Sequence, residues 1–126
     1  MTKKEGTELK ELVKKLVSLR DGNRCFKCGK CVPALQWSHL YPEGKYPRIK
    51  YEPLNVCLMC YSCHLHWWHI NIIEAYEWYL EAFTPMRRKK LKRLIDNYDN
   101  IEKDDYDIRR AALCKEIKQL SNKDKL

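Results

Sequence analysis

The chain has 126 residues, of which 44% are hydrophobic, so it can bury one modest core and we expect a single domain. No stretch approaches the ~18 apolar residues of a membrane span, and the start lacks the apolar run of a secretory signal, which favours a soluble cytoplasmic protein. The formal net charge of +8 at pH 7 favours an anionic partner, and nucleic acid is the commonest such partner inside cells.

The N-terminal half is predicted to begin with an amphipathic helix over residues 7–20 and to continue as loops. In that helix, apolar side chains recur at three- to four-residue spacing, with Lys and Arg between them. Asp21-Gly22-Asn23 ends the pattern. From residue 24 to about residue 53, glycines and prolines interrupt any helical period, so we expect short strands at 35–37 and 48–51.

The C-terminal half is predicted to be helical. Apolar and aromatic residues over 63–83 follow a helical period without a proline, which predicts one long helix whose tryptophans lie in the core. Thr84-Pro85 is typical of an N-cap followed by proline at the first helical position, and opens a further helix over 84–98. After an acidic turn at 99–105, we expect a last helix over 106–120.

Two cysteine pairs with the spacing Cys-x-x-Cys predict a zinc site. In a cytoplasmic protein the seven cysteines are expected to be reduced, which favours metal binding over disulfides. Cys25 and Cys28 are followed by Gly29, which permits the tight turn of a zinc knuckle, and Cys60 and Cys63 supply a matching pair. We therefore predict a structural Zn²⁺ bound by these four cysteines.

The other three cysteines leave alternatives open. Cys31 extends the first pair and Cys57 the second, which gives two triplets of identical spacing. Six thiolates would also suit an iron–sulfur cluster or a two-zinc cluster. The four-cysteine zinc is preferred because Gly29 marks the knuckle turn. Cys114 lies in a helical pattern, where a small buried thiol needs no function.

The residues around these cysteines resemble the zinc-knuckle variant of the HNH (ββα-metal, or His-Me finger) endonuclease family. His39, Asn55 and His64 match the family's order His, Asn, His, and eight residues separate Asn55 from His64 as in the family. The order of motifs over about residues 20–80 is most similar to that of the phage NinG (Rap) recombination proteins. The resemblance implies an α+β fold: a small ββα-metal core with the four-cysteine zinc at its base.

The resemblance also implies a nuclease that hydrolyses phosphodiester bonds in DNA with a catalytic Mg²⁺ or Mn²⁺. In it, His39 would deprotonate water, Asn55 would hold the His39 ring or brace the loop, and His64 would bind the cation. These roles suit the chemistry, because hydrolysis needs a base with a near-neutral pKa and a cation that neutralises charge on the phosphate. All four histidines of the chain lie between residues 39 and 69, and this clustering itself indicates a site.

The partner of His64 in binding the catalytic cation is open. Many family members have Asp or His just before the base, where this chain has Ser38, a poorer ligand. The replacement would be His69 or His66. His69 lies five residues after His64, one more than the usual four, whereas His66 and His69 are three apart and share a helix face. NinG proteins have a histidine that aligns with His66. The sequence does not choose between these pairs.

Basic residues in two segments are predicted to contact nucleic acid. Lys45 and Arg48 lie in the loop between the predicted base and Asn55, near where the family places the scissile phosphate. The densest positive run of the chain is in the helix after Pro85. It consists of Arg87, Arg88, Lys89 and Lys90.

These features predict a metal-dependent endonuclease of phage or viral origin, with branched or recombining DNA as substrate if the NinG likeness extends to substrate. A homodimer would suit cleavage of two strands. The alternatives are a non-catalytic zinc-stabilised DNA-binding module, which Ser38 permits, and a protein-interaction module stapled by zinc. The single domain is expected to comprise the helix at 7–20, the zinc-stabilised core at 24–83 and C-terminal helices at 84–126.

Overall fold

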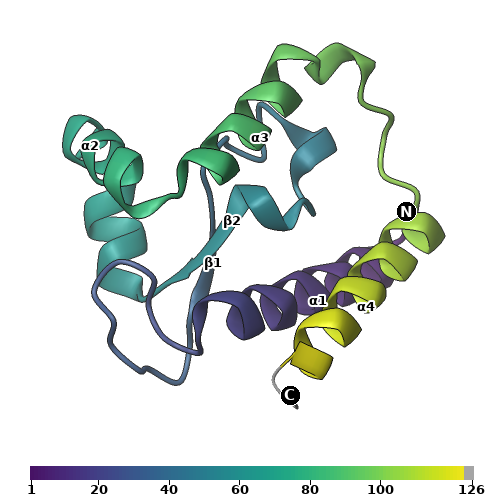
Figure 1. Cartoon of the computed structure of the whole chain (residues 1–126), viewed down its shortest axis with the longest axis horizontal. Helices are drawn as coiled ribbons and strands as arrows, with labels where there is room; N and C mark the ends of the chain where they lie inside the picture. Colours follow the sequence, from purple (N-terminus) through teal and green to yellow (C-terminus); the bar gives the residue numbers. More distant parts are fainter. Residues whose placement is uncertain (124–126) are drawn as a thin grey trace.

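Two short antiparallel strands lie at the centre of the molecule, with helices around them (Figure 1). The computed structural model describes residues 1–123, so the last three positions of the predicted C-terminal segment, 124–126, lie outside the described residues. Strand β1, Gln36–His39, pairs with β2, Val56–Met59, so that Gln36 is opposite Met59 and His39 is opposite Val56. The predicted α+β class is confirmed as a mixture of helices with one small antiparallel sheet.

The helices surround this sheet in chain order. Three of them, η1, η2 and η4, are single 3₁₀ turns, and η3 is a π-helix. The full set is α1 Lys3–Asp21, η1 Pro47–Ile49, η2 Pro53–Asn55, η3 Ser62–Trp68, α2 Ile72–Ala82, α3 Pro85–Asp96, η4 Tyr98–Asn100 and α4 Tyr106–Lys123. Within residues 1–123, none of these helices is long and apolar enough to cross a membrane.

Helix α1 begins earlier than predicted because a capping box starts it. The Thr2 hydroxyl accepts a hydrogen bond from the Glu5 amide at 3.1 Å, and the Glu5 carboxylate accepts one from the Thr2 amide at 2.8 Å. Gly22, with φ 89°, follows the last turn, because a residue without Cβ adopts positive φ freely. Of the predicted apolar face, Leu9, Val13 and Leu16 are buried and Leu12 and Leu19 are partly buried, while Val17 is buried in addition.

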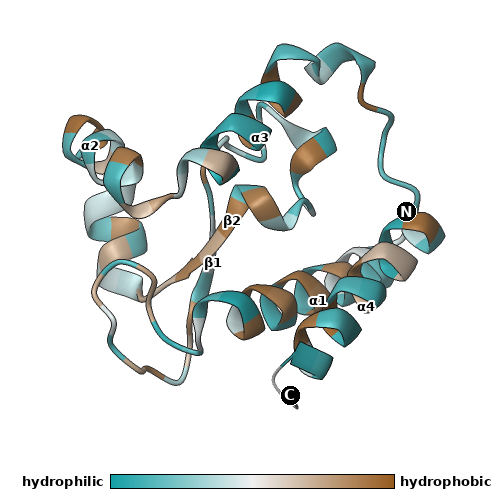
Figure 2. Cartoon of the chain, viewed as in Figure 1, coloured by the Kyte–Doolittle hydropathy of each residue, from teal (hydrophilic) through white to brown (hydrophobic). Residues whose placement is uncertain are grey.

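The core lies between α1 and the sheet. All four residues of β2 are buried, and Figure 2 shows this strand as a hydrophobic band at the centre of the molecule. Helix α4 lies alongside α1 and adds Leu113 to the core, and α3 adds Leu91. Arg110 on α4 pairs with Glu8 on α1, Nε to Oε1 at 2.7 Å, at the edge of this contact.

Two of the predicted elements differ from the structure. The strand predicted at 48–51 is wrong: Pro47 starts the 3₁₀ turn η1, in which the Ile49 amide donates to the Tyr46 carbonyl at 3.2 Å. The single helix predicted over 63–83 is also wrong. It is divided into η3 and α2 at Asn71, whose amide donates to the Trp67 carbonyl while its own backbone leaves the helical region. The predicted strand at 35–37 exists, shifted by one to two residues.

The other C-terminal helices agree with prediction. The Thr84 hydroxyl accepts from the Arg87 amide at 3.2 Å and Pro85 occupies the first turn of α3, as the Thr-Pro pair indicated. Helix α4 begins at Tyr106, as predicted, and extends three residues beyond the expected end at residue 120.

Candidate functional site

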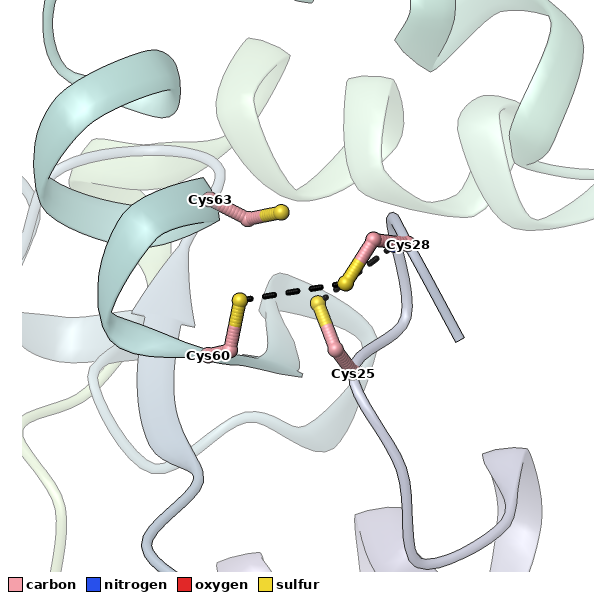
Figure 3. A group of neighbouring side chains, drawn as sticks. All are labelled: Cys25, Cys28, Cys60 and Cys63. Carbon is pink, nitrogen blue, oxygen red and sulfur yellow. Dashed lines mark hydrogen bonds between the residues drawn. The ribbon is translucent and has the colours of Figure 1, made fainter. Parts of the chain in front are cut away.

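The sulfur atoms of Cys25, Cys28, Cys60 and Cys63 converge beside the junction of β2 and η3 (Figure 3). All four atoms lie within 4.8 Å of one another, and the Cys28 and Cys60 sulfurs are 3.8 Å apart. Four thiolates at about 2.3 Å from a tetrahedral zinc would be about 3.8 Å from one another. The group is therefore able to hold a zinc ion, as the sequence predicted.

The local backbone forms the knuckle turn and stabilises the thiolate form of Cys25. Gly29 has φ 78°, and its amide donates to the Cys25 carbonyl at 2.9 Å, which closes the predicted knuckle turn. Burial disfavours the Cys25 thiolate, but hydrogen bonds from backbone groups of Cys28, Cys60 and Lys27 outweigh it and lower the pKa of Cys25 to about 7. Burial and the neighbouring thiols raise the pKa of Cys63, so a bound cation would favour its thiolate form.

The remaining cysteines lie outside this group. Cys57 is fully buried on β2, opposite Ser38, and burial raises the pKa of its thiol to about 12. Cys31 is exposed to solvent, and Cys114 is partly buried on α4. The geometry thus favours the single four-cysteine site over either a cluster of six thiolates or the alternative pairings.

His39, at the end of β1, has a defined tautomer. Its Nε2 lies 2.9 Å from the Lys50 carbonyl oxygen, and because that oxygen only accepts, Nε2 carries the hydrogen. Nδ1 is then the unprotonated nitrogen. Burial lowers the pKa of His39 below its ordinary value of 6.5, which keeps the ring neutral near pH 7. A neutral ring with a free nitrogen is what a general base requires.

Asn55 braces the loop that carries the Lys50 carbonyl. The side chain is fully buried; its Oδ1 accepts from the Tyr41 amide at 2.8 Å, and its Nδ2 donates to the carbonyls of Tyr41 and Ile49 at 3.1 and 3.3 Å. Of the two roles considered for this residue, the contacts are those of a loop brace. The Asn55 side chain thus fixes both ends of the loop between residues 41 and 49, and its backbone carbonyl accepts from the Leu40 amide, next to His39, at 3.0 Å.

The π-helix η3 brings His64 and His69 together. A π-helix closes i to i+5 hydrogen bonds, and the His69 amide indeed donates to the His64 carbonyl at 3.3 Å. The two side chains consequently meet, with 2.9 Å between their Nε2 atoms. The five-residue spacing, which exceeds the i to i+4 hydrogen-bond step of an α-helix, matches the i to i+5 step of this helix.

A residue on β1 orients His64. The Gln36 side-chain oxygen lies 2.8 Å from His64 Nδ1 and must accept its hydrogen, so His64 Nε2 presents a lone pair toward His69. Histidines that bind metals commonly donate their other ring hydrogen to such an oxygen. Burial, then the neighbouring His69 and His39, lowers the pKa of His64, which favours the neutral ring that a metal needs.

The other two residues considered as ligands lie elsewhere. His66 is exposed and packs against the Tyr61 ring, with 5.1 Å between centroids. Ser38 is fully buried, and its hydroxyl points back to the Gln36 carbonyl at 3.5 Å. Within residues 1–123, the four cysteines are the one group in which three or more metal-ligating side chains converge. A cation at His64 and His69 would therefore have only two protein side chains as ligands.

His39, His64 and His69 line one cleft of about 1090 Å³. Trp68 joins the η3 wall of the cleft to the β1 wall. The Trp68 indole Nε1 donates to the His39 carbonyl at 3.3 Å. Lys10 and Lys14 of α1 also line this cleft. No sequence pattern indicated these two lysines or Gln36, because only the fold brings residues from α1, β1 and η3 to one place.

The predicted nucleic-acid contacts lie in different surroundings. Lys45, Lys89 and Lys90 are exposed and Arg88 is partly exposed, so nucleic-acid contact stays a prediction for these four. Arg48 connects its loop to η4, with Nη1 donating to the Asp99 carbonyl at 3.1 Å, and its guanidinium lies 5.6 Å from the Tyr98 ring centroid.

Arg87, the last of the predicted contacts, is held by other parts of the fold. Its guanidinium donates to the Leu54 and Val56 carbonyls at 3.1 and 3.0 Å and stacks on Phe83, 4.0 Å from the ring centroid. Arg20 donates to the same Val56 carbonyl at 2.8 Å. Burial, then the nearby Arg20 charge, lowers the pKa of Arg87 to about 10.

Comparison with protein-family models, with curated proteins and with solved structures finds no match to this chain in any of the three. The assignment of the site therefore rests on its own geometry.

Replacing Cys28 with Ser is expected to remove most of the bound zinc and to unfold the segment around the knuckle, because the folding free energy of such sites comes from the metal. Zinc content by atomic absorption and thermal melting by circular dichroism would measure both effects. Cys31→Ser is the matched control and should leave one zinc per chain. Equal zinc in both variants would contradict the four-cysteine site.

Arg87→Ala is expected to lower the free energy of unfolding by roughly 2 kcal/mol, because two carbonyls lose a charged donor. Lys89→Ala, on the exposed side of the same helix, should leave stability unchanged and weaken nucleic-acid binding. Urea denaturation and fluorescence anisotropy with labelled DNA would separate the two effects. If Arg87→Ala kept full stability and lost binding, the structural assignment of Arg87 would be overturned.

Proposed function

We propose that the chain is a divalent-metal-dependent endonuclease of the HNH type that hydrolyses phosphodiester bonds in DNA. The observation that carries the proposal is the pair of His64 and His69 nitrogens, 2.9 Å apart in the cleft that His39 also lines. Two nitrogens at about 2.1 Å from one cation and at right angles to each other would be about 3.0 Å apart. The pair thus fits two adjacent positions on one metal ion.

In this proposal β1, β2 and η3 form the ββα-metal core, with the four-cysteine zinc beside it. His39 Nδ1 accepts the proton of the attacking water, and the Lys50 carbonyl fixes the ring for this step. Asn55 keeps that carbonyl in place through the loop. A divalent cation, Mg²⁺ or Mn²⁺, would neutralise charge on the phosphate and the leaving oxygen. With His64 and His69 as its protein ligands, the cation would also bind substrate oxygens and water.

The basic charge of the chain supports a nucleic-acid substrate. The order His39, Asn55, His64 and its resemblance to HNH sequences support DNA hydrolysis in particular. The zinc site contributes stability in this proposal and has no part in the chemistry, because cysteines occupy its four positions.

A non-catalytic DNA-binding module is the second candidate, and Ser38 favours it. Its hydroxyl is buried, so the position that commonly supplies a further metal ligand offers none to the cleft. A fold that keeps the zinc and the basic surface but binds the second metal weakly would bind DNA without cutting it.

Purified protein is expected to nick supercoiled plasmid and to cut branched DNA when Mg²⁺ or Mn²⁺ is added. His39→Ala should lower the rate by about 10²- to 10⁴-fold, the usual contribution of a general base. His69→Ala should raise the metal concentration needed for half-maximal cutting by at least about tenfold. His66→Ala is the control, since this side chain faces Tyr61 instead.

Each variant should be assayed for zinc first, so that loss of the fold is not read as loss of catalysis. Wild-type protein that binds DNA with full zinc and cuts neither substrate would favour the binding module. Equal losses in His66→Ala and His69→Ala would contradict the metal pair.

The pH dependence of cleavage should follow the neutral form of His39. Because burial lowers the pKa of His39 from its ordinary 6.5, activity should rise with pH through the acidic range and change little above neutral pH. Initial rates at constant ionic strength would give the curve. A rate that still rises steeply above pH 7 would exclude His39, as placed here, as the base.

A further inference from the structure

The walls of the histidine cleft are mostly apolar and aromatic, which is unusual for a surface expected to meet phosphates. Helix α2 and the strand region supply these walls, and two of their side chains are well exposed: Ile72 at 73% and Tyr76 at 60%. The Tyr76 and Tyr79 rings lie side by side, 6.3 Å between centroids and tilted by 31°. The apolar part of the lining includes Trp37, Leu40, Trp68, Ile72, Tyr76 and Tyr79.

Positive charge reaches the cleft from α1 and not from the basic run of α3. Lys10 and Lys14, one helical turn apart, both line it, and Lys10 Nζ lies 5.1 Å from the centre of the Trp37 ring. Figure 1 shows α1 and α2 on different sides of the two strands. The lining thus combines cationic groups from α1 with aromatic rings from α2, β1 and η3 and with the three histidines.

We propose that this cleft binds an unpaired nucleic-acid strand, with bases stacked on Tyr76 and its aromatic neighbours and phosphates beside Lys10 and Lys14. The inference rests on the proposed nuclease function, since it names the substrate of the same site. A duplex offers phosphates and groove edges while its base faces are stacked inside, so aromatic walls would gain little from it. An unpaired strand offers both groups at once, and any base can stack because each has a π-face.

Binding can be measured without cleavage by leaving out Mg²⁺ and Mn²⁺ while the zinc is retained. The probes are a labelled oligothymidylate, an oligouridylate, an abasic deoxyribose-phosphate strand of equal length, and a duplex of equal phosphate count. Anisotropy gives the affinity, and quenching of tryptophan fluorescence reports bases near Trp37 and Trp68. We expect the base-bearing strands to bind at least about tenfold more tightly than the abasic strand and to quench more strongly.

Variants locate the effect within the cleft. Tyr76→Ala should lose about tenfold in affinity for base-bearing strands only, whereas Tyr76→Phe should keep it and Ile73→Ala, on the exposed side of α2, should have no effect. Lys10→Ala and Lys14→Ala should weaken binding of base-bearing and abasic strands alike, each lowering the salt dependence by about one phosphate contact. Lys15→Ala, exposed on the same helix, is their control.

Equal affinity for abasic and base-bearing strands would overturn the inference, as would tighter binding of the duplex or an unchanged affinity in Tyr76→Ala. The oligothymidylate and oligouridylate arms distinguish DNA from RNA as the source of the strand. Because no catalytic cation is present, the outcomes are separable: protein that cuts plasmid but ignores bases keeps the proposed function and loses this inference. Protein that binds bases in this cleft and does not cut DNA keeps this inference and loses the proposed nuclease function.

Discussion

The approach of the four cysteine sulfurs determines how the rest of the molecule can be arranged. It joins the knuckle that follows α1 to the segment between β2 and η3, and thereby closes the long stretch from Cys28 to Cys60. Closing such a stretch costs conformational entropy, and a bound metal offsets that cost only in the folded state. His64 follows Cys63 directly, so its place in the cleft depends on the same closure.

A second constraint is the polar interior at the junction of η2 and β2. The segment between β1 and β2 contains two short 3₁₀ turns, η1 and η2, and is otherwise irregular, so many of its carbonyls need partners from elsewhere. Asn55 binds Tyr41 and Ile49 from within this segment, while Arg20 and Arg87 reach the Val56 carbonyl from two different helices. The Asn55 contact with the Ile49 carbonyl fixes the backbone next to the Lys50 carbonyl, which holds the His39 ring. The two arginines fix Val56, which is opposite His39 in the sheet.

The features that the sequence predicted well are those set by local spacing. The cysteine pairs, the knuckle glycine, the Thr84-Pro85 helix start and the inner face of α1 all depend on residues within one turn of each other. Strand β2 was missed because Val56–Met59 is buried on both faces and shows no alternation. The strand expected at 48–51 failed because Pro47 favoured a turn. Gln36, Lys10 and the inward guanidinium of Arg87 depend on tertiary contacts, which no local pattern encodes.

The π-helix η3 affects how a pair of histidines can be found in a sequence. A π-turn is what an α-helix becomes when it takes in one additional residue without unwinding. In η3 the His64 and His69 rings meet although five positions separate them. A π-helical turn can therefore pair side chains that are one residue further apart than the α-helical step. A search for histidine pairs by the four-residue step of an α-helix would pass over this one.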